Sequence, residues 1–432
     1  MHTLSDCLAR DAADPLRSLR GHFALPADLI YLDGNSLGPL PRSAAARATQ
    51  VVNQEWGQGL IRSWNDAGWF GMPQRVGARI APLIGAQPHE VVAADSTSVN
   101  LFKVLSAALA VAAADAPGRT VVLSERHNFP TDLYIAQSVC QTHGCTLELV
   151  EPEAIDGALN SKVAVLLLTH VNYRTGAMHD MAAITAAAHA AGALVVWDLA
   201  HSTGAVPVDL NGAEADFAVG CGYKFLNGGP GAPAFVWAHA RHVARTDLLW
   251  MQPLTGWFGH AAPFAFTPDY QSAPGMARFL CGTPPVISLA ALDAALDVFD
   301  AAHALGGMAA LRAKSLALGD LFIELEEQRC AGLGLGLATP RQHAQRGSQV
   351  SLTHCDADAS HSAYAIVQAL IARGVIGDFR AGAPGEPDIL RFGITPLYLG
   401  YEDIWNAVEQ LKQVLESGEW REARFARKAA VT

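Results

Sequence analysis

The feature that most constrains the fold is the stretch from Trp197 to Gly231, WDLAHSTGAVPVDLNGAEADFAVGCGYKFLNGGPG. Residues 194–197 (LVVW) form a short β-branched apolar run that ends at Asp198, and residues 216–221 (DFAVGC) form a second run that leads to Lys224. Short apolar runs of this kind predict buried strands. Open α/β sheets bind their ligands beyond the carboxyl ends of the strands. The sequence therefore predicts a carboxylate and an amine at one ligand-binding edge.

Strand and helix patterns alternate on the N-terminal side of this stretch and continue beyond it. Strands are predicted at residues 90–93, 120–125, 163–168 and 233–238, and helices after Ser96, after HNFP and at 182–191. Such alternation is typical of a parallel sheet with crossover helices. We therefore expect an α/β fold with a mainly parallel sheet.

The C-terminal part of the chain has a different pattern, typical of a smaller α+β domain. Helices are predicted at Val286–Phe299, 308–328 and 360–373, and strands in GLGLGLATP, SQVSLTH and ILRFGIT. We expect residues 61–299 to form the large domain and 300–432 the small one. Residues 1–60, with a helical pattern from Pro41 to Ile61, are expected to join the small domain and line the active-site entrance.

Composition excludes several classes of function. The 432 residues carry a net charge of −11, which argues against a general nucleic-acid or anionic-membrane surface. The apolar run from Leu101 to Ala114 is shorter than a bilayer requires, so we expect a buried helix. The N-terminus is acidic and lacks the apolar core of a signal peptide.

Cysteine and histidine patterns favour reduced thiols and no metal centre. The seven cysteines are scattered and form no CxxC pair, which predicts a cytoplasmic protein. No HExxH motif occurs, and we interpret the loose group formed by His354, Cys355, Asp356, Asp358 and His361 as a polar loop. Cys221, near Lys224, is expected to be a small core residue.

Two local patterns suggest how an anionic ligand could be held. Thr97 and Ser98 begin a predicted helix just after a strand, and a helix N-terminus carries about half a positive charge that favours phosphate. No GxxxxGK[ST] or GxGxxG motif is nearby, so a nucleotide is not expected, and an ordinary helix cap stays an alternative. Lys224 lies between Tyr223 and Phe225, surroundings that would desolvate an amine as a Schiff-base lysine requires.

Together these motifs resemble the pyridoxal phosphate (PLP) enzymes of the aspartate aminotransferase fold, and bacterial kynureninases in particular. The likeness extends from about residue 30 to about residue 400. The motifs that carry it are YLDGNSLGPLP (31–41), HNFPTDLYIA (127–136), THVNYRTG (169–176), DLAHSTG, GYKFLNGGPG and GWFGH (256–260).

The resemblance implies a PLP-dependent fold-type-I enzyme, with a seven-stranded sheet sandwiched by helices in the large domain. The implied reaction is hydrolytic Cβ–Cγ cleavage of L-kynurenine to anthranilate and L-alanine, in tryptophan catabolism and NAD biosynthesis. 3-Hydroxy-L-kynurenine is a second candidate substrate. The resemblance also implies a cytoplasmic homodimer with the active site at the subunit interface.

Residue roles follow from the same resemblance. Lys224 would hold PLP and act as general base, Asp198 would pair with the ring nitrogen, and Tyr223 would contact the phosphate or protonate an intermediate. The expected cofactor contacts are Thr97, Ser98, Phe129, Pro130, Thr131, Asp132, Thr169, Asp198, His201, Tyr223, Lys224, Trp257 and Thr283, with Trp257 and Thr283 coming from the neighbouring subunit. The expected substrate contacts are Asn35, Ser36, Trp64 and Arg391, with Arg391 as the clamp on the α-carboxylate.

Several of these residues have purely structural alternatives. Trp64, Trp257 and His201 could be packing residues, and Arg391 could be a surface charge. Two other functions also stay open. One is a different PLP enzyme, a class V aminotransferase or a cysteine desulfurase, for which Cys330 and Cys355 are the candidate reactive thiols. The other is a non-catalytic binding module of the same fold.

Overall fold

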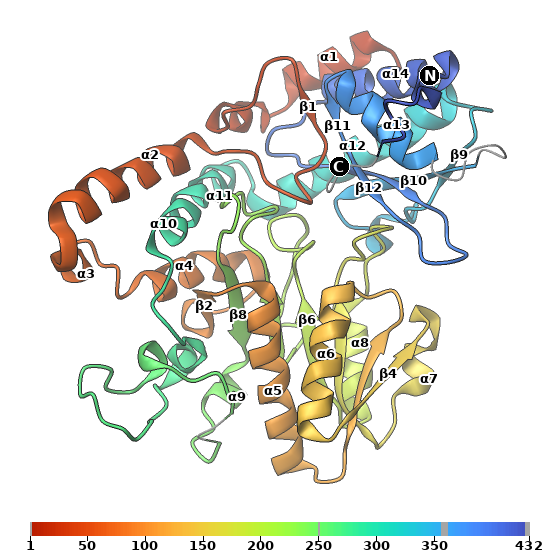
Figure 1. Ribbon diagram of the computed structural model, residues 1–432. Helices are drawn as coiled ribbons and strands as arrows, with labels where there is room; N and C mark the ends of the chain where they lie inside the picture. The colour runs from red at the N-terminus through yellow and green to blue at the C-terminus, as the bar shows by residue number, and fades with distance from the viewer. Residues whose placement is uncertain (1, 249–250, 356–361, 428–432) are drawn as a thin grey trace.

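The computed structural model describes residues 2–248, 251–355 and 362–427. A seven-stranded sheet lies at the centre of the lower half of the molecule in Figure 1, with strand order β2-β8-β7-β6-β5-β3-β4. β8 runs antiparallel to both of its neighbours, and the other neighbouring pairs are parallel. The strands are β2 (Val91–Ala94), β3 (Val121–Glu125), β4 (Thr146–Val150), β5 (Val163–Thr169), β6 (Leu194–Asp198), β7 (Phe217–Gly220) and β8 (Ala234–Ala238). The predicted strands of the large sheet are all present, and β4 is an additional edge strand.

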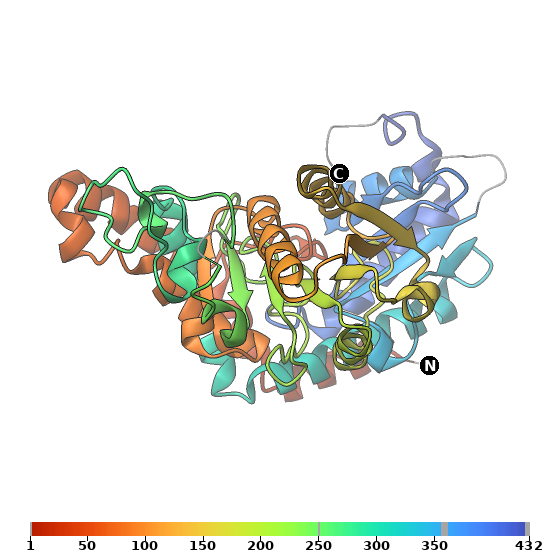
Figure 2. The same ribbon diagram turned by 90° about the horizontal axis from the view of Figure 1, so that it is seen from below.

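Helices cover both faces of this sheet, because alternate residues of each buried strand point to opposite sides. Val165 and Leu167 of β5 pack in one hydrophobic cluster with α5 (Thr97–Asp115) and α6 (Pro130–His143). Leu166 and Leu168 pack in the cluster that includes α8 (Met181–Ala190). Figure 2 shows α5 and α6 on one side of the strands and α8 on the other.

The C-terminal part of the chain forms a second, smaller sheet of four antiparallel strands, in the order β12-β13-β10-β9. Its strands are β9 (Leu335–Leu337), β10 (Gln349–His354), β12 (Asp378–Arg380) and β13 (Ile389–Gly393). The helices packed around it are α1 (Leu4–Ala13), α12 (Gly307–Arg329), α13 (Ser362–Ala372) and α14 (Tyr401–Ser417). Residues 360–361 of the predicted α13 region lie outside the described residues.

The N-terminal segment is joined to the C-terminal part of the chain by a parallel pair of short strands. β1 (Ile30–Tyr31) pairs with β11 (Val375–Ile376), and α1 packs against α14. The pair brings the loop after Tyr31 to the small sheet. The division into residues 1–60, 61–299 and 300–432 stays a prediction.

Two predicted helices differ from those in the structure. The helix expected over Val286–Phe299 is two helices, α10 (Val286–Ala295) and α11 (Asp297–His303), separated at Leu296. The pattern from Pro41 to Ile61 forms α2 (Arg42–Gln50) and then a π-helix over Val51–Gly59. The remaining short helices are α3 (Ser63–Asp66), α4 (Met72–Ile80), α7 (Ile155–Ala158) and α9 (Ala240–Val243).

One helix of the described residues, α5, is long and apolar enough to cross a membrane by length and composition. The expectation that this segment is too short was therefore wrong, because the helix extends from Thr97 to Asp115. Within its most apolar window 61% of the residues are buried inside the protein. α5 is a core helix packed on β5, β6, β7 and β8.

Candidate active site

Lys224 lies in the turn after β7, at the edge of the sheet where β6 ends. Its Nζ is 3.0 Å from Nε2 of His201, and it lies 5.8 Å from the ring centroid of Phe129 and 5.8 Å from that of Tyr223. Phe129 occupies the N-cap position of α6, just before Pro130. Two strand-end loops and a helix N-terminus therefore converge on one amine.

His201 is buried beside this amine. Its pKa lies well below the usual value because burial disfavours the charged ring, and the positive charge of Lys224 acts in the same direction. Its Nδ1 is buried and has no hydrogen-bond partner among the residues that the structure describes. A neutral imidazole therefore contacts Lys224 through Nε2.

A pair of buried carboxyl groups faces the same space. Asp198, at the end of β6, accepts a hydrogen bond from the N–H of Ala200 at 2.7 Å. Asp132, on the first turn of α6, is hydrogen-bonded to Asp198, and its pKa is well above the usual value because of burial and the charge of Asp198. Burial also raises the pKa of Asp198, against the opposing charge of Lys224. The proton of the pair therefore belongs on Asp132, which leaves Asp198 as the anion near Lys224.

Thr169, at the end of β5, connects the acid pair to a residue that the sequence did not single out. Its hydroxyl donates to Oδ1 of Asn128 and lies 3.4 Å from Oδ2 of Asp132. Asn128 in turn donates to the hydroxyl of Ser124 at 3.0 Å. The only feature of the sequence that could have pointed to Asn128 is its position, two residues before Pro130, which was predicted as a site residue.

The N-terminus of α5 opens on a cavity of about 400 Å³. Its lining includes Ser96, Thr97, Tyr223 and Pro285. The hydroxyl of Thr97 is buried and has no partner within residues 2–248, 251–355 and 362–427, while Ser96 caps the helix through the N–H of Val99. Ser98 follows Thr97 on the first turn of α5, and Thr131 follows Pro130 on α6. The cavity has the donors that a phosphate group needs.

A buried arginine lies on the small sheet beside this site. Arg391 of β13 is 1% exposed, so the alternative that it is a surface charge is wrong. Its Nη1 donates to the carbonyl of Tyr173 at 2.7 Å, and its Nη2 donates to the hydroxyl of Ser36 at 2.6 Å and to the carboxylate of Asp378. The ring of Tyr173 packs edge-on against Phe129 at 5.2 Å, which links Arg391 to the neighbourhood of Lys224.

The loop over residues 31–41 is held against both groups. The N–H of Gly38 donates to the carbonyl of Tyr223 at 2.8 Å, and a Cβ at Gly38 would overlap the carbonyl oxygen of Lys224. Asn35 is fully buried and its amide donates to Gln349 at 3.4 Å. The loop over residues 31–41 is therefore packed against the turn that carries Lys224 and against the small sheet.

Three further predicted site residues, Trp64, Trp257 and Thr283, contact one another in a separate group. Trp64 packs edge-on against Trp257 at 6.1 Å, and the indole N–H of Trp257 donates to Thr283 at 3.3 Å. Trp257 is 37% exposed. In the described part of the chain, the ring contacts and hydrogen bonds of Trp64, Trp257 and Thr283 do not reach Lys224.

The residues around Lys224 fit PLP. An amine, a buried carboxylate and a cavity at a helix N-terminus, lined by a hydroxyl with no partner among the described residues, are the groups that an aldehyde, a pyridine nitrogen and a phosphate require. By contrast, the described residues include no group of three or more His, Cys, Asp or Glu side chains that could hold a metal ion. Asp356, Asp358 and His361 lie outside the described residues.

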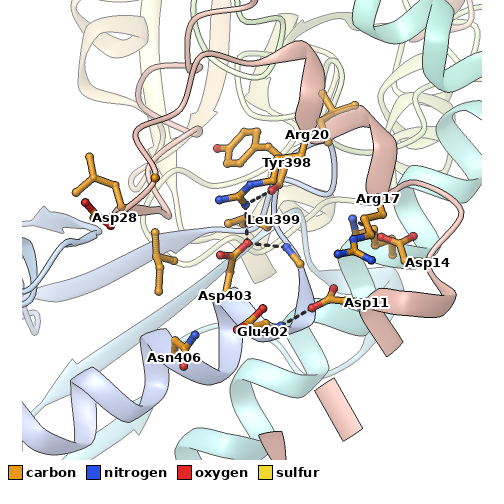
Figure 3. A pocket seen from close by; sticks show the side chains of 16 residues that line it. Asp11, Asp14, Arg17, Arg20, Asp28, Tyr398, Leu399, Glu402, Asp403 and Asn406 are labelled. Carbon is orange, nitrogen blue, oxygen red and sulfur yellow. Dashed lines mark hydrogen bonds and ion pairs between the residues drawn. The ribbon is translucent and has the colours of Figure 1, made fainter. Parts of the chain in front are cut away.

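A second polar cavity, of about 410 Å³, lies between α1, α14 and the segment before β1 (Figure 3). Several of its charged groups pair with one another. Lys314 pairs with Asp14 at 2.7 Å, and Arg20 pairs with Asp403 at 2.8 Å. Asp11 accepts from two backbone N–H groups at the start of α14. This cavity is therefore not a candidate for the reaction site.

Comparison with known proteins agrees with the geometry. Residues 311–411 match the family model of the kynureninase C-terminal domain. The chain is 56% identical to a kynureninase of Burkholderia pseudomallei (strain K96243) and 55% identical to one of Pseudomonas fluorescens, each over 100% of both chains.

Solved structures give the fold. A cysteine desulfurase from Thermococcus onnurineus superimposes with a TM-score of 0.74 at 18% identity, over 93% of this chain and 98% of that one. The cysteine desulfurase CsdA from Escherichia coli gives 0.72 at 20% identity, over 93% and 98%. This confirms the predicted PLP-dependent fold-type-I class, and the full-length identity to the relatives above places the chain in the kynureninase family.

Proposed function

We propose that the chain catalyses the PLP-dependent hydrolysis of L-kynurenine to anthranilate and L-alanine. The observation that carries this proposal is the full-length identity of 56% to a kynureninase, together with Lys224, Asp198 and Arg391 meeting at one buried site. When bound, PLP supplies an electron sink for bond changes at the α and β carbons of an amino acid.

The residues of the chain divide the work around that cofactor. Lys224 holds PLP and, once released by substrate, moves the proton at the substrate Cα. Asp198 is the anion that keeps a proton on the ring nitrogen, and the neutral Asp132 hydrogen-bonds to Asp198 and orients it. Thr97 and Ser98 bind the phosphate at the N-terminus of α5.

Substrate is held from the small sheet. The guanidinium of Arg391 binds the α-carboxylate, because its planar fork suits two parallel hydrogen bonds. Its Nε is buried and has no partner in the residues described, so it has a donor to spare. Asn35 and Ser36 close the site from the loop over residues 31–41.

Tyr223 is placed for a role at the cofactor. It lines the cavity at the N-terminus of α5 and its ring lies 5.8 Å from Nζ of Lys224. Burial raises the pKa of its hydroxyl, so the group stays protonated and is a proton donor at neutral pH. We propose that it donates to the phosphate or protonates the fragment left after the C–C bond breaks.

A homodimer would give Trp64, Trp257 and Thr283 a role, because these residues could contact the active site of the second copy. Large apolar side chains surround Trp64 and Trp257 on the surface, including Trp56 at 58% exposed and Phe264 at 67%. Exposed apolar clusters of this kind mark interfaces. In this proposal Trp257 and Thr283 complete the cofactor site of the second copy, and Trp64 meets the ring of its substrate. Light scattering should give twice the chain mass of 45.7 kDa.

The proposal also covers the cellular compartment, the pathway, the domain boundaries and the alternative substrate. We place the enzyme in the cytoplasm, in tryptophan catabolism and NAD biosynthesis, and we assign residues 61–299 to the PLP-binding domain. 3-Hydroxy-L-kynurenine is the alternative substrate. All seven cysteines are free, as a reducing compartment would leave them.

The test is incubation of the PLP-loaded protein with L-kynurenine and no added keto acid. Fluorescent anthranilate and L-alanine in equal amounts support the proposal, whereas a strict requirement for a keto acid would favour an aminotransferase. Sulfide release from cysteine would favour a desulfurase, but Cys330 is buried, and burial raises its thiol pKa to about 12. A thiol of that kind is a poor nucleophile.

A further inference from the structure

The loop over residues 31–41 contains an acid that the roles above do not use. Asp33 lies two residues after β1, and its Oδ1 is buried with no hydrogen-bond partner among the side chains and backbone that the structure describes. An ionised carboxylate with an unsatisfied buried oxygen is costly. Asp33 is therefore a group whose protonation the site can change at low cost.

The charges that face Asp33 form a compact network. Asp378 accepts from Arg391 and pairs with Arg380 at 2.7 Å, and Ser36 donates to Asp378 at 3.0 Å. Asp378 is fully buried and paired with both guanidinium groups, so it is the acid that balances part of their charge. Ser36 links Asp33 to this network, because its N–H donates to the carbonyl of Asp33 at 2.9 Å and its hydroxyl contacts both Asp378 and Arg391.

The ionisation of Asp33 is poised near neutrality. Burial raises its pKa to about 7, the charge of Asp378 raises it as well, and Ser36, Arg391 and Arg380 oppose the rise. Tyr31 and Tyr398 also face Asp33, and burial raises the pKa of both hydroxyls, so they stay neutral.

Counting charge gives the consequence for a carboxylate ligand. With Asp33 ionised, the network of Arg380, Arg391, Asp378 and Asp33 is neutral, and a carboxylate at Arg391 would leave one uncompensated negative charge in a buried site. With Asp33 protonated, the network carries one positive charge that the carboxylate neutralises. Binding and protonation therefore favour each other.

We propose that Asp33 takes up one proton from solvent when the substrate α-carboxylate binds at Arg391, so that substrate binding in this enzyme is proton-linked through the loop over residues 31–41. The inference rests on the proposed function, because it takes Arg391 as the carboxylate site. Asp33 acts through Arg391 and the charge of the network, so it is a positioning residue and not a catalytic one.

The size of the effect follows from Coulomb's law. Two unit charges about 5 Å apart at an effective dielectric near 20 interact by about 3 kcal/mol, so a carboxylate bound at that separation would raise the Asp33 pKa by about two. At pH 8 the free protein then holds little of the proton and the complex holds most of it. We expect uptake of about 0.8 proton per site at pH 8, and a Kd that rises up to tenfold per pH unit between about 7 and 9.

The experiment measures proton uptake directly and needs no turnover. The probe is the deamino analogue of kynurenine, which keeps the carboxylate and the aryl ketone but has no amine to react. Calorimetric titration of the PLP-loaded protein at pH 8, in two buffers of different ionisation enthalpy, gives the number of protons bound with the ligand. The wild type, Asp33→Asn and Asp28→Asn are compared; Asp28 is an exposed acid of the same segment, outside this network.

The wild type and Asp28→Asn should both take up about 0.8 proton, and Asp33→Asn close to none, with a Kd that is nearly constant from about pH 6.5 to 8.5. Equal uptake in wild type and Asp33→Asn, or no uptake by the wild type, overturns the inference while leaving the proposed function intact. If Asp33→Asn does not fold, the number of protons that the wild type takes up on binding the analogue is the deciding measurement. Failure of the wild type to bind the analogue at any pH contradicts the proposed function and the inference with it.

Discussion

Replacing Arg391 with lysine tests the carboxylate clamp while keeping its positive charge. In the structure the guanidinium already donates to Tyr173, Ser36 and Asp378, while its Nε has no partner among the described residues and can donate to a ligand. A lysine ammonium has three donors at a single point and cannot keep these contacts and grip a carboxylate with two parallel bonds.

The expected loss is one charge-assisted hydrogen bond to substrate, about 2 kcal/mol. Since 1.36 kcal/mol is a factor of ten, KM for L-kynurenine should rise about 30-fold in Arg391→Lys, with a smaller change in kcat. The assay is initial-rate anthranilate fluorescence over a range of kynurenine concentrations. Kynurenine amide serves as a second substrate, because it lacks the charge that the clamp recognises.

Arg380→Lys is the matched control. Its side chain is 34% exposed and its contacts to Asp378 can be replaced by an ammonium, so KM should change less than about threefold. The reasoning is refuted if Arg391→Lys leaves KM within about threefold of the wild type, or if it raises KM for the amide as much as for the acid.

Three other substitutions test the packing and charge around the site. Gly38→Ala forces a Cβ into the carbonyl of Lys224, so kcat/KM should fall about 100-fold while circular dichroism stays native; normal activity would refute the contact. Asp216 is buried, which opposes ionisation, but hydrogen bonds from three cationic or imidazole side chains hold its pKa below the usual range. Its contribution is therefore complete above the unfolded pKa of about 3.9 and is lost gradually as pH falls from there through the lower pKa of the folded state. Asp216→Asn should lower the free energy of unfolding by about 3 kcal/mol at pH 7 and by somewhat less at pH 3 in urea titrations. Glu386→Gln removes the partner of Arg174 across the two sheets and should lower Tm, with a loss of about 1–3 kcal/mol; an unchanged Tm would show that the pair contributes nothing.

Much of the large sheet could be predicted because its strands are short, apolar and buried on both faces. β5 and β6 are of this kind, and the residues that end them, Thr169 and Asp198, follow at once as site candidates. β4 was missed because its sequence, TLELV, alternates with partly exposed residues and is stabilised mainly by pairing with β3.

Contacts between site residues that lie far apart in the sequence could not be predicted from local sequence patterns. Asp132 was expected as a cofactor contact, and its partner Asp198 could not be foreseen, because only the folded sheet brings the two carboxyl groups together. Asp378 lies in a three-residue strand whose role is set by its register with Arg391 in β13. The same holds for Tyr173, whose backbone carbonyl, not its side chain type, accepts from Arg391.

The most direct measurement of the central claim is the location of the cofactor on the chain. Borohydride reduction of the PLP-loaded protein, digestion and mass spectrometry should place a phosphopyridoxyl group on the peptide containing Lys224, and Lys224→Ala should lose both this adduct and anthranilate formation. An adduct on another lysine, or kynurenine cleavage that survives Lys224→Ala, would contradict the account.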